Sequence, residues 1–334
     1  MTNRHSPQIG FVVIGRNEGS RLDESLRAIR NDSESVVYVD SGSTDGSPEA
    51  ARQLGVEVIE LSAQHLFSAA RARNAGFEFL RDRAPTLEYV QFVDGDCVLD
   101  PGWPSIAIAT FESGEDIVAV CGRRRERLPE ASIYNRICDV EWRIPPLGEA
   151  LVFGGDVAIR VDALTQAGGY DPSLISCEDE ELALRLRAAG GKILQLEESS
   201  GCHDAAMFRV KQWLLRAVRW GHGIAQVSSM HAASSDGHYA QAKRRTLIYG
   251  GAVPLTAIVL VPPTSGISLA LLLLFVLQFR RLVEQTLNIG IEKDARLWSM
   301  SCVMAQPANL VGMLLYHYRR RVGDELRIID YKRR

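Results

Sequence analysis

The chain has 334 residues, of which 46% are hydrophobic and 24% charged, and its formal net charge is −3 at pH 7. This length allows one large domain or two smaller ones, each with an ample core, and the composition is that of a globular protein. The lack of a basic surplus argues against a nucleic-acid-binding protein, and six cysteines without a CxxC pair argue against a zinc framework or a disulfide scaffold.

Charge is distributed unevenly along the chain. The first ten residues, MTNRHSPQIG, contain no apolar core of signal-peptide length, so we expect the first domain to stay in the cytoplasm. Charged and apolar residues are mixed up to about residue 240. Residues 247–279 and 297–318 contain no Asp, Glu, Lys or Arg. The sequence therefore predicts a soluble body followed by an apolar tail.

Short β-rich runs alternate with helix-like segments in the first hundred residues. The predicted strands are residues 9–14, 36–39, 56–61 and 89–93, and the predicted helices are residues 22–29, 48–54 and 69–80. This alternation predicts βαβ units and a mostly parallel sheet, in which ligands bind beyond the carboxyl ends of the strands. The polar turns at Asp40 and Asp94 are therefore expected to face one crevice.

The fourth predicted strand ends in two carboxylates, Asp94 and Asp96, separated only by Gly95. Two close carboxylates repel each other unless a cation lies between them. Carboxylate oxygens suit Mg²⁺ or Mn²⁺, and such ions often share their ligand shell with substrate phosphates. The turn therefore predicts a divalent-metal site that carries a diphosphate, and the alternative is a turn of solvated acids.

Six ordered blocks of the chain carry a family resemblance. They are VVIGRNEGSRLDESLRAI (12–29), VVYVDSGSTDGS (36–47), ARARNAGFEFL (70–80), FVDGDCVLDPGW (92–103), FGGDVAIRVDALTQAGGYD (153–171) and CEDEELALRLRAAGG (177–191). Over about residues 8–205 the chain resembles the family-2 glycosyltransferases, which are inverting enzymes that use nucleotide-diphosphate sugars. The resemblance implies an α/β GT-A fold, Rossmann-like, with a mostly parallel central sheet flanked by helices. It implies a catalytic domain over residues 1–205.

The resemblance places the nucleotide between two turns. The turn Arg16-Asn17-Glu18 and the strand end at Asp40 and Ser41 would cup it. Many relatives carry two consecutive acids at this strand end, whereas this chain has Ser41 after Asp40, so the nucleobase stays open. An acid there suits the N3–H of uracil or thymine, and the alternative is that Asp40 caps the following turn.

The same resemblance assigns donor contacts on the third predicted helix. Arg71, Arg73 and Asn74 fall where the family neutralises and positions the nucleotide, and the alternative is a solvated helix face. Asp94 and Asp96 match the family's DXD motif, which binds the metal on the donor diphosphate. His203 lies where some relatives supply a further metal ligand, and imidazole suits Mn²⁺ better than Mg²⁺. The expected cofactor is therefore Mn²⁺ or Mg²⁺.

The pair Glu178-Asp179 resembles the family's ED motif, whose Asp is the proposed catalytic base. Asp179 would deprotonate the incoming hydroxyl, and its pKa would be raised by partial burial and by neighbouring acids. The same residues begin an acid-rich segment with arginines four and more positions later, which favours a helix on its own. The two interpretations are compatible.

The resemblance places the acceptor and the donor sugar beside Gly154, Gly155, Asp156 and Glu178. Paired glycines permit close backbone approach, and Asp156 can accept from sugar hydroxyls. Trp142 is a candidate to stack on a sugar face, and a core position is equally compatible with it. The basic run GRRRERL (122–128) would meet an anionic acceptor or the pyrophosphate, and a solvated loop is the alternative.

Residues 208–226 mix basic and apolar side chains at helical spacing, which is typical of a helix at a membrane interface. Within it, Arg216 to Trp220 approaches the QxxRW motif of processive family members, and Trp220 is a candidate acceptor contact. Arginine replaces the glutamine, so a single transfer per acceptor is favoured. Residues 206–245 are expected to form this interfacial helix and a linker.

Residues 246–334 are expected to form an apolar helical region associated with the membrane. The segment 247–279 is interrupted by PPTSG and flanked by basic clusters, which predicts a hairpin that dips into or just spans the bilayer. The segment 297–318 would be another span or an interfacial helix, and buried core helices are the alternative. The expected location is the cytoplasmic face of the cell membrane, with a lipid-linked or polysaccharide acceptor and no nucleic-acid partner.

Two other functions remain open at this point. A nucleotidyltransferase of related fold would share the βα architecture and the acidic metal site, although GRNEGSRL is a poor version of its glycine-rich loop. A non-catalytic membrane scaffold that binds sugar nucleotides is the third hypothesis.

Overall fold

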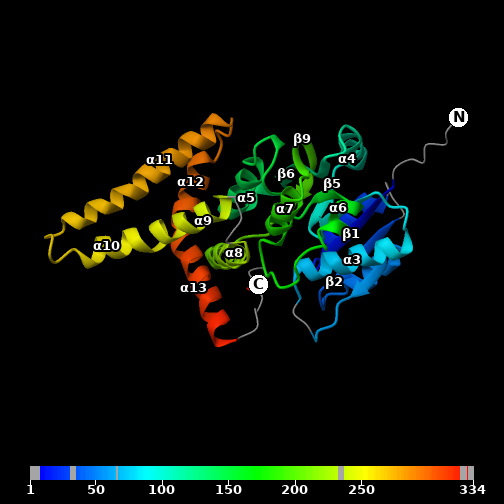
Figure 1. The fold of residues 1–334 in the computed structure, drawn as a ribbon, viewed down its shortest axis with the longest axis horizontal. Helices are drawn as coiled ribbons and strands as arrows, with labels where there is room; N and C mark the ends of the chain where they lie inside the picture. Colours follow the sequence, from blue (N-terminus) through cyan, green and yellow to red (C-terminus); the bar gives the residue numbers. More distant parts are fainter. Residues whose placement is uncertain (1–7, 31–34, 65–66, 232–236, 324–328, 330–334) are drawn as a thin grey trace. The chain divides into compact units, whose positions relative to one another are not determined.

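The computed structural model describes residues 8–30, 35–64, 67–231, 237–323 and 329 (Figure 1). The chain divides into two compact units. The first contains Met1–Arg127, Pro145–Ser173 and Glu178–Ala205, and the second contains Leu128–Ile144, Leu174–Cys177 and Ala206–Arg334. The domain boundaries expected at residues 205 and 245 stay a prediction.

The first unit is built on a nine-stranded sheet. Its order is β3-β2-β1-β4-β8-β6-β9-β5, and β7 pairs with β9 beside this path. The strands are β1 (Ile9–Gly15), β2 (Val36–Asp40), β3 (Glu57–Glu60), β4 (Tyr89–Asp94), β5 (Cys97–Leu99), β6 (Ile117–Glu126), β7 (Gly148–Glu149), β8 (Val157–Arg160) and β9 (Lys192–His203). The helices are α1 (Ser20–Arg30), α2 (Ser47–Gln53), α3 (Ala69–Arg83), α4 (Trp103–Glu112), α6 (Val161–Gln166) and α7 (Glu178–Ala188). All seven elements predicted in the first hundred residues are confirmed.

The expectation of a mostly parallel sheet is wrong, because the sheet is mixed. Strands β3, β2, β1 and β4 are parallel to one another, and β6 is parallel to β9, but β8 runs antiparallel to both β4 and β6. Strands β5 and β7 run antiparallel to β9. Strand β8 is short and apolar and is buried between two other strands, so its composition resembles that of a parallel strand. The direction of the strand is therefore set by how the chain enters it and not by its residues.

The strand register places the polar turns at one edge of the sheet. Gly15 of β1 pairs with Asp40 of β2, and Ile14 pairs with Asp94 of β4. Because these strands are parallel, their carboxyl ends meet there. The two polar turns predicted to share an edge therefore do so.

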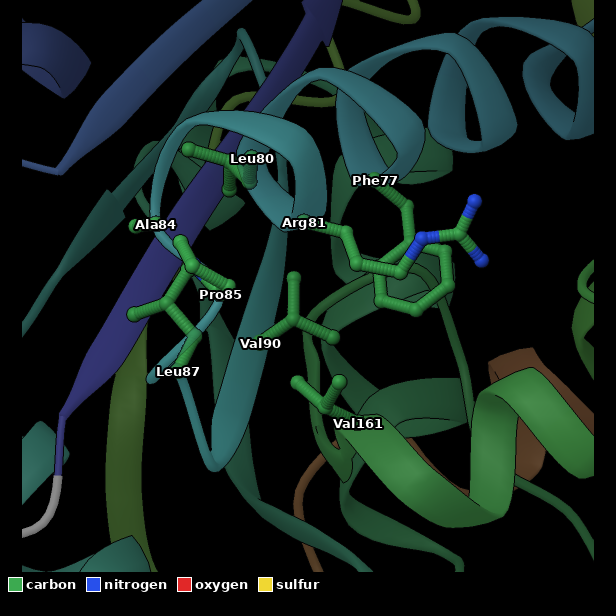
Figure 2. A pocket seen from close by; sticks show the side chains of 8 residues that line it. All are labelled: Phe77, Leu80, Arg81, Ala84, Pro85, Leu87, Val90 and Val161. Carbon is green, nitrogen blue, oxygen red and sulfur yellow. The ribbon is translucent and has the colours of Figure 1, made fainter.

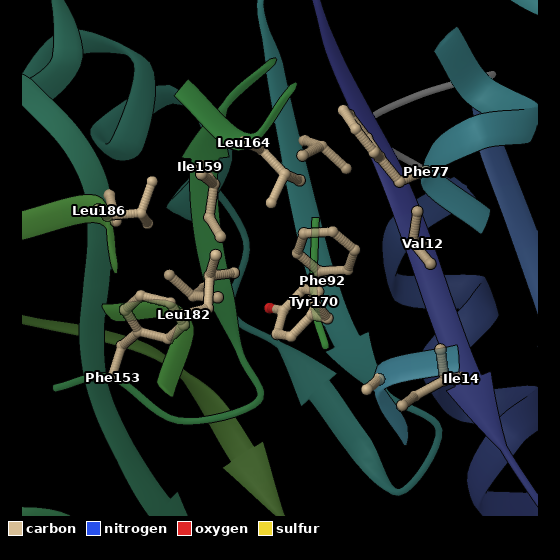
Figure 3. Close-up of a cluster of buried hydrophobic side chains, with 14 of the residues drawn as sticks. Val12, Ile14, Phe77, Phe92, Phe153, Ile159, Leu164, Tyr170, Leu182 and Leu186 are labelled. Carbon is tan, nitrogen blue, oxygen red and sulfur yellow. The ribbon is translucent and has the colours of Figure 1, made fainter. Parts of the chain in front are cut away.

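Successive residues of the strands point to opposite faces of the sheet and into two apolar clusters. On one face, Val12 and Phe92 pack with residues of α3, α6 and α7 (Figure 3). The ring of Tyr170 meets that of Phe92 edge to face, with centroids 5.3 Å apart. On the other face, Phe11 packs in a cluster with Trp103, whose indole N–H donates to the buried Gln91 side chain at 2.9 Å. The two clusters hold the strand ends in place.

A small apolar pocket lies between α3 and β4 (Figure 2). Its lining includes Leu80, Leu87 and Val90. Val90 stands four residues before Asp94 on the same strand, so the pocket is at the opposite end of β4 from the polar edge. It is therefore separate from the acidic turns.

The second unit is helical. Its elements are η1 (Pro129–Ala131), α5 (Ile133–Arg143), α8 (Val210–Met230), α9 (Gly237–Leu247), a π-helical turn η2 (Ile248–Ala252), α10 (Val253–Val259), η3 (Ile267–Leu272), α11 (Leu273–Asn288), α12 (Ala295–Met304) and α13 (Gln306–Val322). Helices α8 and α13 pack closely along their length. At Gly312 a Cβ atom would collide with the carbonyl oxygen of Val218, and at Gly221 it would collide with that of Asn309. The two helices therefore touch backbone to backbone.

His222 of α8 is fully buried beside this contact. Its ring lies edge to face with that of Tyr316, with centroids 5.3 Å apart. Neither ring nitrogen has a hydrogen-bond partner among the described residues. Burial, together with the charge of Arg319, lowers the pKa of His222 to about 4. The imidazole is therefore neutral in the folded protein at pH 7.

Among the described residues, no helix has both the length and the apolar character that a membrane crossing requires. Neither segment 247–279 nor segment 297–318 contains such a helix within the described residues. The first segment turns back at residues 260–266, and the second is divided between α12 and α13. The interfacial helix expected over residues 208–226 corresponds to α8.

Candidate active site

The acidic turn joins β4 to β5. The N–H of Gly95 donates to the carbonyl of Ile14 at 2.7 Å, and a Cβ at Gly95 would lie 3.1 Å from that oxygen. A side chain there would push β1 away, so the turn requires a residue of minimal size. The turn places Asp94 and Asp96 on either side of Gly95, with Asp96 buried and Asp94 partly exposed.

Asp96 lies against the histidine predicted to bind metal. Cys97 pairs with His203 across the antiparallel strands β5 and β9, which brings His203 beside the turn. The imidazole Nε2 lies 3.4 Å from Oδ1 of Asp96. Two residues separated by more than one hundred positions are thus brought together by the β5–β9 pairing.

Asp94 belongs to a second group of possible metal ligands. Its backbone N–H donates to Oδ1 of Asp156 at 3.3 Å. Ligand atoms of Asp94, Cys97 and Asp156 lie within 4.8 Å of one another, as do those of Asp96, Cys97 and His203. Among the described residues, the structure therefore places Asp94 in one group and Asp96 with His203 in the other, and Cys97 joins the two.

The donor atoms fit a divalent cation. Carboxylates and one imidazole are the ligands that Mn²⁺ accepts, and Mg²⁺ takes the carboxylates alone. Burial raises the pKa of the Cys97 thiol well above its usual range, and a soft sulfur ligand matches Mn²⁺ or Mg²⁺ poorly. The candidate ligands are therefore Asp94 and Asp156 in one group and Asp96 and His203 in the other, and the metal set of Asp94, Asp96 and His203 stays a prediction.

Arg73 joins the acidic turn to the predicted base. Its side chain is 2% exposed. The guanidinium lies 3.0 Å from Oδ1 of Asp94, 2.9 Å from Oε1 of Glu178 and 3.1 Å from Oδ1 of Asp179. It also faces the ring of Tyr170, 5.3 Å from its centroid. One buried cation thus serves three carboxylates and is not part of the solvated helix face that the sequence left open.

Asp179 stands in the first turn of α7 and is 16% exposed. Burial raises the pKa of Asp179 well above its usual range. The Arg73 charge opposes that shift, and the charges of Glu178 and Asp94 add to it. A carboxylate with a raised pKa is a better proton acceptor, which is the property that a general base needs.

The paired glycines make room for this cluster. A Cβ at Gly155 would lie 2.5 Å from Oδ2 of Asp94 and 2.6 Å from a guanidinium nitrogen of Arg73. A Cβ at Gly154 would collide with the guanidinium of Arg124. The absence of side chains at the two glycines therefore leaves room for Arg73 and Arg124. The close approach of a sugar to these glycines stays a prediction.

The sequence places Arg124 only within the basic run GRRRERL, and the structure brings its side chain to Asp156. Its Nε lies 3.2 Å from Oδ2 of Asp156, and both side chains are largely buried. The run GRRRERL was expected to form a loop or to meet an anion, but most of it belongs to strand β6. The alternation of a strand explains why Arg124 turns inward while the side chain of Arg125 is exposed and pairs with Asp100.

The carboxylate of Asp40 accepts hydrogen bonds from its own strand and from the turn that follows it. One of its oxygens accepts from the hydroxyls of Tyr38 and Ser43, and the other accepts from the N–H groups of Gly42 and Ser43. A carboxylate has about four lone-pair positions, so these four donors fill them. The capping alternative describes this structure, and the adjacent Ser41 is partly exposed.

The turn Arg16-Asn17-Glu18 lies against the same loop. Asn17 accepts from the N–H of Thr44 at 2.7 Å, and its own N–H donates to Ser43 Oγ at 2.9 Å. Glu18 is buried and pairs with Arg21 at 2.7 Å. The exposed Arg16 faces the ring of Phe67, with 5.5 Å to the centroid. Arg16 thus keeps an accessible positive charge at the edge where a nucleotide is expected.

The other two donor candidates on α3 make backbone contacts. Asn74 exchanges two hydrogen bonds with the backbone of Tyr170, at 2.7 and 2.8 Å, and so fixes the turn that precedes it. Arg71 donates to the carbonyl of Ser62 at 3.1 Å. Tyr170 was not predicted as a site residue, and its position after Gly168 and Gly169 is the signal that marks the turn.

Trp142 and Trp220 belong to the second unit. Both are partly buried, Trp142 in α5 and Trp220 in α8. Near them, Arg216 forms a two-pronged ion pair with Glu141, at 2.7 and 2.9 Å. The structure thus assigns these two tryptophans to a different unit from the acidic cluster.

Two family patterns match the chain. The family described as "Glycosyl transferase family 2" matches residues 11–165, and "Glycosyl transferase family group 2" matches residues 145–315. The first match contains the acidic turn, and the second contains Asp179 and most of the helical unit.

Curated relatives are similar over much of the chain. Pre-mycofactocin glycosyltransferase of Mycobacterium tuberculosis is 28% identical, over 96% of this chain and 70% of its own length. Glycosyltransferase AglE of Haloferax volcanii is 25% identical, over 66% of this chain and 74% of its own.

Solved structures share the fold. The mannosyltransferase PcManGT of Pyrobaculum calidifontis, in complex with GDP-Man and Mn²⁺, has a TM-score of 0.63 at 18% identity, covering 93% of this chain and 88% of its own. Staphylococcus aureus TarS 1–349 has a TM-score of 0.51 at 14% identity, covering 95% of this chain and 92% of its own.

Proposed function

This chain belongs to glycosyltransferase family 2 and is a nucleotide-sugar-dependent glycosyltransferase, and we propose that it transfers the sugar to a hydroxyl with inversion, in a metal-dependent reaction. The nucleotidyltransferase and scaffold alternatives give way to this family assignment. The observation that carries the proposal is the position of Arg73. Its guanidinium contacts Asp94 of the acidic turn and Asp179 at the start of α7, so the expected donor site and the expected base are adjacent.

Asp179 is the proposed base. Its contact with Arg73 fixes the direction of the carboxylate, and its raised pKa favours accepting the proton of the acceptor hydroxyl. The freed oxygen then attacks the anomeric carbon as the bond to the diphosphate breaks. Attack from the face opposite the leaving group inverts the configuration and needs no covalent enzyme intermediate.

Asp94, Asp96 and His203 would hold the Mn²⁺ or Mg²⁺ ion. A bound divalent ion supplies charge neutralisation for the diphosphate leaving group. Arg73 and Arg124 are each paired with carboxylates of this cluster, so they preserve its geometry. The exposed Arg16 provides a positive charge toward the nucleotide. PcManGT binds GDP-Man and Mn²⁺ in a similar fold, which supports the metal assignment.

The test is donor turnover. Purified protein with Mn²⁺ is incubated with a panel of labelled nucleoside-diphosphate sugars, and slow release of free sugar and nucleoside diphosphate is expected from one of them. NMR of the first product would show the inverted anomer. EDTA should stop the release and added Mn²⁺ should restore it. Absence of turnover with every donor, or a retained anomer, would contradict the proposal.

We also propose that the protein works at the cytoplasmic face of the cell membrane, on a lipid-linked or saccharide acceptor, with one transfer per acceptor. The apolar, exposed side chains of the second unit support a membrane location. Arg216, which replaces the glutamine of the processive motif, is engaged with Glu141 and supports single transfer. Fractionation of cells would test the location, and release without detergent would oppose it.

A further inference from the structure

Residues 247–279 form a hairpin of two helical arms, here called the apolar hairpin (Figure 1). Elements η2 and α10 make the first arm, and η3 and the start of α11 make the second. The hydroxyl of Ser268 donates to the carbonyl of Ala257 at 2.7 Å, and the rings of Tyr249 and Phe275 meet with centroids 5.9 Å apart. These two contacts lie eight and seven residues apart on the two arms, so the arms run antiparallel in nearly constant register.

The outer surface of the apolar hairpin is exposed and apolar. Ile267, at the tip, is 78% exposed, and Leu273 is 61% exposed. The other large apolar side chains exposed on it are Leu247, Ile248, Leu255, Ile258, Val259, Leu260, Leu269, Leu272, Val276 and Leu277. A contiguous exposed apolar patch of this kind marks a surface that another molecule or a membrane covers.

The turn at the tip leaves no backbone N–H without a partner. The N–H groups of residues 260, 261, 264, 265, 266 and 267 all donate to carbonyls of residues 256–264, and Pro262 and Pro263 have no N–H. The hydroxyl of Thr264 donates to the carbonyl of Leu260, and the N–H of Ser268 donates back to it. Water can satisfy the N–H groups of an exposed turn, whereas in hydrocarbon each N–H needs a partner within the protein.

Positive charge lies only at the open end of the hairpin. The register of the two contacts, continued along the arms, places Arg245 opposite Arg280. Arg244 and Arg281 flank these residues, and all four side chains are exposed. Basic side chains at this level suit anionic lipid headgroups, while the uncharged arms suit the hydrocarbon below them.

We propose that the apolar hairpin inserts into an anionic lipid bilayer from one side and returns to the same side. Residues 267–279 span about 20 Å at the rise of these helices, against about 30 Å for the hydrocarbon core. The tip therefore passes the middle of the bilayer without reaching the far surface. This inference rests on the proposed function only for the location at the cytoplasmic face of the membrane. Insertion of the hairpin would explain how the protein is held there.

The test compares vesicle binding of matched variants. Purified full-length protein is mixed with vesicles of phosphatidylcholine and phosphatidylglycerol (7:3) and floated on a density gradient. The parent protein floats. Ile267→Asp/Leu273→Asp, here called the tip variant, places one charge at the tip and one on the second arm and should lower vesicle partitioning at least tenfold. The control Leu147→Asp/Leu151→Asp changes two exposed leucines of the first unit and should float like the parent.

Three outcomes would overturn the proposal. The parent protein fails to float, or the tip variant floats as well as the parent, or the tip variant changes the sedimentation of the protein without vesicles from dimer to monomer. A change from dimer to monomer would mean that the hairpin binds a second copy of the chain and not a membrane.

Depth is measured with Ile267→Trp. Its added fluorescence should be quenched more by lipids brominated deep in the acyl chain than by lipids brominated near the headgroup. The reverse order would mean that the hairpin lies flat on the surface.

Donor hydrolysis in detergent, measured on the same preparations, separates this proposal from the proposed function. Donor hydrolysis without vesicle binding refutes only the insertion of the apolar hairpin into the bilayer. Vesicle binding without hydrolysis of any donor refutes the proposed function alone.

Discussion

A guanidinium nitrogen of Arg73 lies 3.1 Å from Oδ1 of Asp179, although the two residues stand on different helices, α3 and α7. The same side chain reaches Asp94 at the end of β4. The proposed base and the acidic turn therefore share one buried cation. Replacing any one of Arg73, Asp94 and Asp179 changes the electrostatic environment of the other two.

Replacing Arg73 by Met should destabilise the protein strongly. The change leaves the carboxylates of Glu178 and Asp179 without their buried counter-charge, which costs about 3–5 kcal/mol. Urea unfolding measures the loss. The control is Arg83→Met, which breaks an exposed ion pair with Glu57 and should cost less than about 1 kcal/mol. Equal losses in the two variants would contradict a central role for Arg73.

Asp179→Asn should abolish transfer and leave donor binding nearly intact. The amide cannot accept the hydroxyl proton, and loss of a general base lowers kcat by about 10²–10⁴-fold. Calorimetric titration with the donor and Mn²⁺ measures binding, and product release measures turnover. Retained turnover would remove Asp179 from this role.

Gly155→Ala should reduce activity while the fold persists. The added methyl group would lie 2.5 Å from Asp94 and 2.6 Å from Arg73, so these two side chains must move apart. Overpacking of this kind lowers the free energy of unfolding by about 1–3 kcal/mol, and here the strain is concentrated at the acidic turn. Gly237→Ala is the control, because only the end of a flexible side chain lies near its Cβ, at 3.5 Å. Donor hydrolysis and the melting temperature report the two effects.

The metal assignment predicts a loss of Mn²⁺ binding in His203→Ala and Asp96→Asn. Each change removes one donor atom, and apparent Mn²⁺ affinity should fall by at least about tenfold. Electron paramagnetic resonance of free Mn²⁺ measures the affinity without reference to activity. Cys97→Ser should bind Mn²⁺ as the parent does, because a soft sulfur ligand contributes little. Normal Mn²⁺ affinity in both His203→Ala and Asp96→Asn would move the site elsewhere.

The buried His222 predicts that stability falls in mild acid. The pKa of this imidazole is about 4 in the folded protein and 6.5 for the ordinary group, so between these values the unfolded chain binds more protons. Stability therefore decreases as pH falls from 6.5 toward 4, with a loss of about 2 kcal/mol at pH 5 relative to pH 7.5. His222→Leu should remove this dependence, as chemical unfolding at the two pH values would show. An unchanged pH dependence in that variant would assign the effect to other groups.

The sequence predicts the parallel half of the sheet well, because its strands are apolar runs closed by polar turns. It does not predict the direction of β8, since a strand buried on both sides looks alike in either direction. It predicts that Asp94, Asp96 and Asp179 matter through their motifs. It does not show that Arg73 joins them, because Arg73 and Glu178 are 105 positions apart.

Local patterns also misplace some residues. Arg124 stands in a basic run that resembles a solvated loop, but the strand it belongs to carries it inward to Asp156. Asp40 is a candidate for the nucleobase, which stays a prediction, and its oxygens accept from Tyr38 of the same strand and from the turn that follows. Neither outcome is encoded in the residue type. Both depend on which neighbours the fold supplies.

The glycine contact between α8 and α13 fixes the alignment of the two helices. At Gly312 the chain offers only hydrogen to the carbonyl of Val218, while the positions one turn away on the same face of α13, Ala308 and Tyr316, carry side chains. A slip of one turn along the pair would bring one of these side chains to that oxygen, so the neighbouring alignments are forbidden by collision. The two helices can separate, but they cannot slide.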